Sequence, residues 1–162
     1  MASTMREIRF RVRGIPRPAG SKRPFRNPTT GKIVLVDASG EPGRNWRQSC
    51  QAAALLATGD GPLLEGPLHL VLTFYLTRPK GHFRTGSAHA GEVKPTARLY
   101  PTTRPDTTKL VRAVEDALTG IIWRDDSQVV AQTATKVYSD DGSCGVDVLI
   151  ELWEGTVGER PW

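Results

Sequence analysis

The apolar run at residues 68–76 constrains the fold of this chain more than any other feature. It reads Leu-His-Leu-Val-Leu-Thr-Phe-Tyr-Leu, so apolar side chains occupy nearly every position rather than every second one. A strand with one face in water alternates apolar and polar residues, whereas a nearly continuous run is typical of a strand inside a sheet. The run therefore predicts a central strand around which the other elements are arranged.

Four further segments have the patterns of strands. Residues 6–13 alternate apolar side chains with arginines, which predicts a half-buried strand, and residues 33–36 predict a short one. Residues 129–138 and 145–153 are also predicted to be strands, and the polar segment 139–143 between them predicts that they pair as a hairpin.

Two segments have apolar side chains at the three- and four-residue spacings of a helix. One is predicted to begin at Arg44 or Asn45 and to end near Ala57. The other is predicted over residues 107–119, with Gly120 at the position of a C-terminal cap. This order predicts a single α+β domain over the whole chain, with two main helices packed on a mixed sheet of about four strands.

Three segments are predicted to be irregular. Residues 14–24 form a basic loop whose prolines interrupt any strand or helix. Residues 79–104 form a long basic loop with little periodicity, and a loop of that length inside a domain is usually functional or disordered. Residues 154–162 are expected to form a loose tail.

The formal charge of +5 is distributed unevenly along the chain. Residues 1–47 carry a net charge of +8 and residues 78–112 carry +6, whereas residues 113–162 carry −7. Two basic blocks beside an acidic one are what an enzyme that binds a polyanion at a carboxylate site would have. On charge alone, an uneven solvated surface explains the same numbers equally well.

Several classes of protein are disfavoured by the composition. No apolar run approaches the roughly 18–20 residues of a membrane span, and the N-terminus lacks the apolar stretch of a signal peptide. We therefore expect a cytoplasmic protein with no membrane partner. Cys50 and Cys144 are too few for a disulfide scaffold or a four-cysteine zinc site, and they are expected to be reduced packing residues.

Three carboxylates flank the second predicted helix. Asp106 stands at its beginning, and Asp125 and Asp126 lie in the polar turn that follows it. If the chain reversal at Gly120 brings Asp126 beside Asp106, their oxygens would suit Mg²⁺ or Mn²⁺. Spacing alone leaves that open, because Asp106 is also a good helix cap and residues 125–127 have ordinary turn composition.

The segment 104–130, RPDTTKLVRAVEDALTGIIWRDDSQVV, resembles the signature of the RusA family of Holliday junction resolvases. The family pattern is roughly Lys/Arg-Pro-Asp-x-Asp-Asn/Lys-Leu-x-Lys/Arg-Ala, then Asp-Ala-Leu-x-Gly, then Asp-Asp-Ser/Ala-Gln-Val. A softer resemblance extends over about residues 8–152. It implies a dimeric, Mg²⁺-dependent endodeoxyribonuclease of phage or prophage type that resolves four-way junctions and takes no small-molecule substrate.

The resemblance also implies roles for individual residues. Asp106 matches the first aspartate of the family pattern, and Asp126 matches the aspartate after the second helix; both are expected to be catalytic metal ligands. Arg112 stands where the family usually has a catalytic lysine. It, or Lys109 beside it, is expected to stabilise charge that develops on the phosphoryl oxygens.

One position departs from the family. Thr108 occupies the place of the second family aspartate, so a neutral hydroxyl replaces an expected metal ligand. Thr108 could still coordinate Mg²⁺ weakly, and Asp125 could compensate for the missing charge. The alternative function is a junction-binding protein of weak or absent catalytic activity. A nucleotide-hydrolysing enzyme is less favoured, because the chain has no glycine-rich phosphate loop.

The basic segments are expected to bind the DNA backbone. In a homodimer, two symmetric sites would cut opposed strands of the junction. The residues expected to contact DNA phosphates are Lys22, Arg23, Arg26, Lys80, Arg84 and Arg104.

Overall fold

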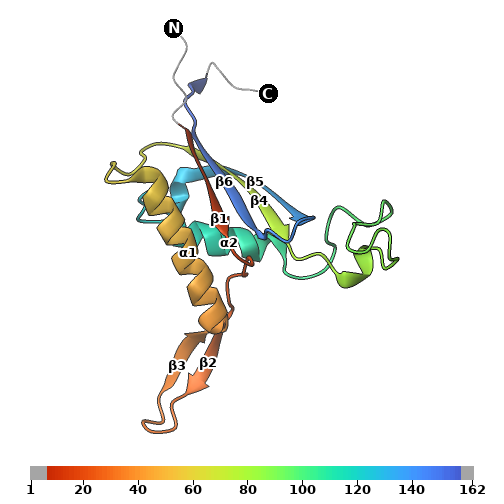
Figure 1. The fold of residues 1–162 in the computed structure, drawn as a ribbon. Helices are drawn as coiled ribbons and strands as arrows, with labels where there is room; N and C mark the ends of the chain where they lie inside the picture. The colour runs from red at the N-terminus through yellow and green to blue at the C-terminus, as the bar shows by residue number, and fades with distance from the viewer. Residues whose placement is uncertain (1–6, 158–162) are drawn as a thin grey trace.

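The computed structural model of the chain describes residues 7–157, and its elements form one α+β domain (Figure 1). Residues 158–162 of the predicted tail lie outside the described residues. The elements in chain order are β1 (Glu7–Arg13), β2 (Lys22–Arg26), β3 (Ile33–Asp37), α1 (Gly40–Thr58), β4 (Leu68–Leu76), the short 3₁₀ helix η1 (Lys80–His82), α2 (Thr107–Leu118), the 3₁₀ helix η2 (Asp126–Gln128), β5 (Val129–Tyr138) and β6 (Gly145–Leu152).

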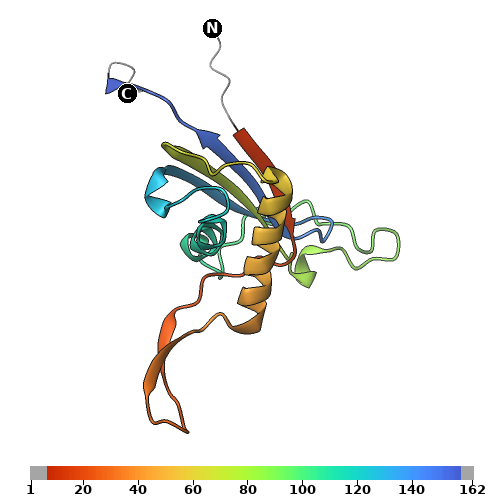
Figure 2. The same ribbon diagram turned by 90° about the vertical axis from the view of Figure 1, so that its left-hand side faces the viewer.

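A four-stranded mixed sheet forms the centre of the molecule, in the order β1-β6-β4-β5. Strand β4 pairs antiparallel with β6 and parallel with β5, which confirms the central position predicted from its apolar run. Helices α1 and α2 lie on the same side of the sheet (Figures 1 and 2). Every second side chain of β4, from Leu68 to Leu76, is buried beneath them.

The helices are held by the apolar stripes that predicted them. In α2, Leu110, Val114 and Leu118 are fully buried, and Trp123 is fully buried just after the helix. The predicted span of α2 is confirmed to within one residue. Burying these side chains is the main contribution to the stability of the helix, because a 12-residue helix is marginal by itself in water.

The predicted hairpin of β5 and β6 is wrong, because β4 lies between the two strands. The segment 139–144 passes the end of β4, where the Ser139 N–H donates to the Leu76 carbonyl at 2.8 Å. Strand β4 has the most continuous apolar pattern and so occupies the interior. Strand β5, with exposed polar side chains such as Gln132 and Thr135, forms an edge.

The N-terminal loop region also differs from the prediction. Residues 22–26 form a strand rather than part of an irregular loop, and they pair with β3 as a two-stranded ribbon. Pro24 is compatible with it, because a two-stranded ribbon leaves half of its backbone groups without a strand partner. Helix α1 begins at Gly40, a turn earlier than predicted, because Pro42 in a first turn needs no N–H partner.

The composition led to expectations about membrane-spanning segments and about the two cysteines. None of the described helices is long and apolar enough to cross a membrane. Cys50 and Cys144 are both free thiols. Cys50 is fully buried, and burial raises its pKa to about 12, so it packs as a protonated apolar side chain.

Candidate active site

Asp106 lies at the N-terminal end of α2, where the backbone is extended. It occupies the cap position of the helix, yet its carboxylate accepts no hydrogen bond from the helix backbone. Its partner is the ammonium group of Lys109, with Nζ 3.6 Å from Asp106 Oδ2, and both side chains are more than half exposed. The capping interpretation therefore does not account for Asp106, and its oxygens remain accessible to a ligand.

A groove of about 620 Å³ opens beside Asp106. Its walls are mixed, with apolar surface from residues such as Ile15 and Tyr138, and with positive charge from Arg17, Arg104 and Lys109. The loop that forms one wall is held to the helix by the Ala19 N–H, which donates to the Lys109 carbonyl at 2.9 Å. Cations around a carboxylate are suited to binding a phosphate backbone near a metal ligand.

A different arrangement surrounds Asp126, near the C-terminal end of α2. The Thr119 hydroxyl lies within hydrogen-bonding distance of the Asp126 carboxylate and 3.0 Å from the Glu115 carbonyl oxygen, and it can donate to only one at a time. The same hydroxyl accepts a hydrogen bond of 3.0 Å from Nε1 of the buried Trp123. Thr119 thus connects an exposed carboxylate to the core.

Glu115 is a second carboxylate at this end, and the sequence interpretation missed it. Its half-buried side chain accepts a hydrogen bond of 2.9 Å from Gln132 Nε2 in β5. Burial raises its pKa, and the charge of nearby Asp126 raises it further. The available signal was the four-residue spacing to Thr119, which puts both residues on one helix face.

Asp125 has a local structural role. Its carboxylate accepts a hydrogen bond of 2.9 Å from the Ser127 N–H, and Gln128 Oε1 accepts one of 3.1 Å from the Asp125 N–H. These reciprocal bonds close the turn. Hydrogen bonding from Ser127, first from its side chain and then from its backbone, lowers the pKa of Asp125. Of the two neighbouring aspartates, Asp126 is therefore the better candidate for a ligand.

Asp106 and Asp126 lie at opposite ends of α2 rather than side by side. The 13 positions from Asp106 to Thr119 correspond to about 20 Å at about 1.5 Å per residue. Strand β5 runs back along the helix, so Gln132 contacts Glu115 while Lys136 Nζ donates to the Pro105 carbonyl at 3.0 Å. Within residues 7–157, no group of three acidic, histidine or cysteine side chains could hold a metal.

Thr108 and Arg112 lie on the exposed surface of α2 between these two ends. Arg112 Nε is 3.9 Å from Asp116, an exposed pair that contributes little to stability. Neither residue is needed to pack the helix, so both side chains are accessible to a ligand.

The predicted DNA contacts occupy three places. Lys22, Arg23 and Arg26 are exposed on the β2–β3 ribbon, and Arg104 lies in the groove beside Asp106. Lys80 and Arg84 are exposed on the 79–104 loop.

The 79–104 loop is anchored to the sheet by one buried arginine. Arg78 donates a hydrogen bond of 2.8 Å to the Arg98 carbonyl and contacts the carboxylate of Asp140. Its guanidinium also stacks 5.3 Å from the centre of the Tyr138 ring. Within the loop, the Arg84 N–H donates to the Glu92 carbonyl at 2.7 Å, so this predicted loop has a defined local structure.

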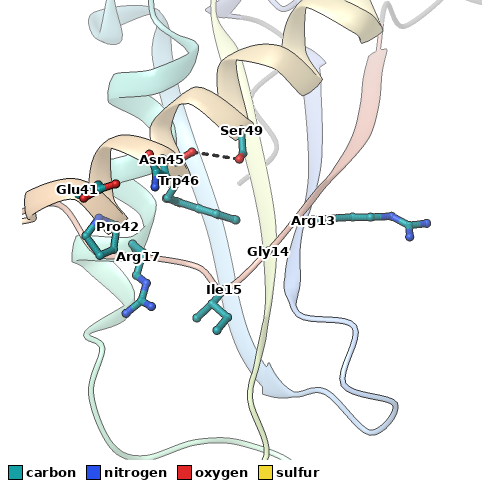
Figure 3. A pocket seen from close by; sticks show the side chains of 9 residues that line it. All are labelled: Arg13, Gly14, Ile15, Arg17, Glu41, Pro42, Asn45, Trp46 and Ser49. Atoms are coloured by element: carbon teal, nitrogen blue, oxygen red, sulfur yellow. Dashed lines mark hydrogen bonds between the residues drawn. The ribbon is translucent and has the colours of Figure 1, made fainter.

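A second pocket, of about 450 Å³, lies between α1 and the segment that follows β1 (Figure 3). Trp46 forms its floor, while the Arg13 side chain points away from Trp46. It contains none of the predicted catalytic residues and one acidic side chain, Glu41. The groove beside Asp106 is therefore the better candidate for substrate binding.

Exposed carboxylates beside cations are residue types that suit hydrolysis of a phosphodiester, and comparison with known proteins identifies the family of the chain. The family model of endodeoxyribonuclease RusA matches residues 16–151, so the chain belongs to the RusA family. RusA enzymes are endodeoxyribonucleases that act on branched DNA junctions. The chain is also 34% identical over 149 residues to "Uncharacterized protein YqaN" of Bacillus subtilis (strain 168), covering 88% of this chain and 94% of that protein.

Proposed function

We propose that this protein is a Mg²⁺-dependent endonuclease that nicks four-way DNA junctions as a homodimer. In this dimer, each active site combines Asp106 of one subunit with Asp126 of the partner subunit. The separation of these two carboxylates along α2 is the observation that carries the proposal. A single subunit keeps them about 20 Å apart, which is too far for one divalent ion.

The open edge of the sheet offers a geometry for such a dimer. Among the described strands, β5 pairs with β4 alone, so its outer edge is available, and Val130 on it is 58% exposed. Two β5 strands paired antiparallel about a two-fold axis would lay the two α2 helices side by side in opposite directions. The N-terminal end of each helix would then lie near the C-terminal end of the other.

The residues at such a composite site have the chemistry that Mg²⁺ prefers. Asp106 supplies a carboxylate from one end of α2, and Asp126 with Glu115 supplies two from the other. Glu115 would restore the negative charge that Thr108 lacks, a part that Asp125 cannot take while it closes its turn. When bound, the ion would supply an activated water for phosphodiester hydrolysis.

Cationic side chains beside the carboxylates would neutralise the negative charge of the phosphate. Lys109 lies 3.6 Å from Asp106 and is exposed, so it can exchange that partner for a phosphate oxygen. Arg112, further along the same helix, carries a guanidinium group that can stabilise charge on the phosphoryl group. Arg17 and Arg104 in the groove would hold the flanking backbone.

Mixing two inactive variants tests the composite site. Asp106→Asn and Asp126→Asn should each abolish nicking of a synthetic junction while binding persists. A heterodimer of the two variants has one site with both native aspartates and one site with neither. Mixing after subunit exchange should therefore restore nicking in one strand. No recovery after mixing, with exchange shown by tagged subunits, would contradict the composite site.

The alternative is a junction-binding protein with weak or no catalytic activity, which the neutral Thr108 favours. Nicking assays with Mg²⁺ on four-way junctions and on linear duplex separate the two functions. Cutting of the junction alone supports the resolvase, equal cutting of both removes junction selectivity, and binding without cutting supports the alternative.

A further inference from the structure

The β2–β3 ribbon projects from the body of the protein (Figures 1 and 2). It carries exposed apolar side chains. Ile33 and Leu35 are each 67% exposed, Phe25 is 47% exposed and Val34 is 45% exposed. An isolated two-stranded ribbon is marginally stable in water, and clustered exposed apolar side chains mark a binding surface. The ribbon therefore has the properties of an arm that is completed by a partner.

The strand register separates the two sides of the ribbon. Pro24 lies opposite Leu35 and Arg26 lies opposite Ile33, so these four side chains share one side with Lys22. We call these five residues the wedge side. It presents an apolar group between two cations. The other side carries Arg23, Phe25, Val34 and Val36.

The charge of the ribbon indicates what covers it. The ribbon, residues 22–37, contains the four cations Lys22, Arg23, Arg26 and Lys32 against one acidic residue, Asp37, which lies opposite Lys22 at its base. Among the side chains that the structure describes, Arg23, Arg26 and Lys32 form no ion pair. Two ribbons packed together would bring like charges into contact, which disfavours a second copy of the chain. DNA instead offers phosphates beside the flat apolar faces of bases.

The ribbon is short, and side-chain hydrogen bonds define the turn at its tip. Each strand has five residues, or about 17 Å at about 3.4 Å per residue, which is close to the diameter of a duplex. At the tip, Asn27 Oδ1 accepts hydrogen bonds of 2.8 Å and 3.1 Å from the N–H groups of Thr29 and Thr30. Gly31 supplies the positive φ of 68° that the turn needs.

We propose that the β2–β3 ribbon is a DNA-binding arm whose wedge side packs against base faces exposed at the branch point of a junction. Lys22 and Arg26 contact the phosphates on either side. Apolar side chains that enter a base step, with cations on the flanking backbone, are an established means of distorting DNA. In linear duplex the bases stay stacked, so the arm would favour branched DNA. The inference depends on the proposed function for its substrate.

The test uses a synthetic four-way junction with 2-aminopurine, a base whose fluorescence rises on unstacking, at the branch point. All proteins carry Asp106→Asn, so that binding is read without cleavage. The wedge variant is Ile33→Thr with Leu35→Thr, and the control from the other side is Phe25→Thr with Val34→Thr. Threonine is β-branched, which suits a strand, and neither variant removes a cation.

We expect the unsubstituted arm to raise the fluorescence and the wedge variant to lose that rise. Junction affinity of the wedge variant should fall by about tenfold. Its affinity for linear duplex and the salt dependence of binding should stay unchanged, because every phosphate contact remains. The control variant should keep both the fluorescence rise and the affinity.

Three results would overturn the inference. The first is no fluorescence rise with the unsubstituted arm, or an undiminished rise with the wedge variant. The second is a monomeric wedge variant beside a dimeric control, which would assign the ribbon to contact between copies. The third is a lower melting temperature of the wedge variant alone, which would assign Ile33 and Leu35 to packing on the body. If the native chain does not nick junctions at all, the proposed function is refuted. The inference is tested separately, because the fluorescence assay requires no cleavage.

Discussion

The two ends of α2 present their aspartates in opposite ways. At the N-terminal end, Asp106 is exposed, pairs with Lys109 and contributes no cap bond to the helix. At the C-terminal end, Asp126 is tied through Thr119 to Trp123, a fully buried residue of the core. A carboxylate that the fold does not use can be dedicated to a ligand, whereas one bonded to the core links the site to the stability of the domain.

Because their surroundings differ, the two ends of α2 would have different roles in the proposed dimer. The Asp106 end lies beside the groove and its cations, so it would receive the DNA backbone. The Asp126 end also holds Glu115, whose pKa is raised first by burial and then by the nearby charge of Asp126. Metal binding would therefore depend most on the second end and substrate alignment on the first.

The largest expected effect comes from removing either carboxylate charge. Asp106→Asn and Asp126→Asn should each lower the nicking rate by about a thousandfold, because a neutral amide is a poor ligand for Mg²⁺. Their stabilities should differ, however. Urea unfolding should show Asp106→Asn unchanged and Asp126→Asn destabilised by about 1 kcal/mol. Near-normal nicking by Asp106→Asn would contradict its assignment as a ligand.

Thr119→Val tests the connection between Asp126 and the core. Valine keeps the shape of threonine but leaves buried Trp123 Nε1 without an acceptor, so the free energy of unfolding should fall by about 1–3 kcal/mol. Thr108→Val at the exposed end is the matched control and should change it by less than about 0.5 kcal/mol. Equal effects of the two variants in urea unfolding would remove the distinction between the ends.

Thr108→Asp adds negative charge at the N-terminal end of α2, beside Asp106. A carboxylate there should lower the Mg²⁺ concentration needed for half-maximal nicking by about tenfold. Thr107→Asp adds the same charge one position earlier on the helix and serves as the control. A Mg²⁺ titration in which both variants shift equally would mean that general charge, not a ligand position, is responsible.

The smallest effect concerns the ionisation of Glu115. Because the folded state raises its pKa, folding favours the protonated form, and stability is lost as pH rises from about 4.5 through the raised value. Glu115→Gln removes that loss and can still bond Gln132, so its melting temperature should exceed that of the native chain at pH 7. The two should converge near pH 3. A difference that is independent of pH would contradict this origin.

The elements of the fold were largely predictable, because their signals are local. The apolar run of β4 and the helical spacing in α2 each reflect which side chains one element must bury. The pairing of β5 and β6 was predicted wrongly, since adjacency in sequence favours a hairpin and the competing partner, β4, lies some 60 residues earlier. Residues 22–26 were missed as a strand because Pro24 interrupts the pattern that identifies one.

The candidate site likewise has some features that follow from local sequence and others that depend on packing. The family motif alone predicts two of the carboxylates, Asp106 and Asp126, and the neutral Thr108. Three features could be seen only in the folded chain. Asp125 closes a turn, Glu115 lies near Asp126, and α2 keeps Asp106 and Asp126 apart. Residue types set the chemistry that a chain can perform. Distances between residues depend on how separate elements pack, which no short stretch of sequence specifies.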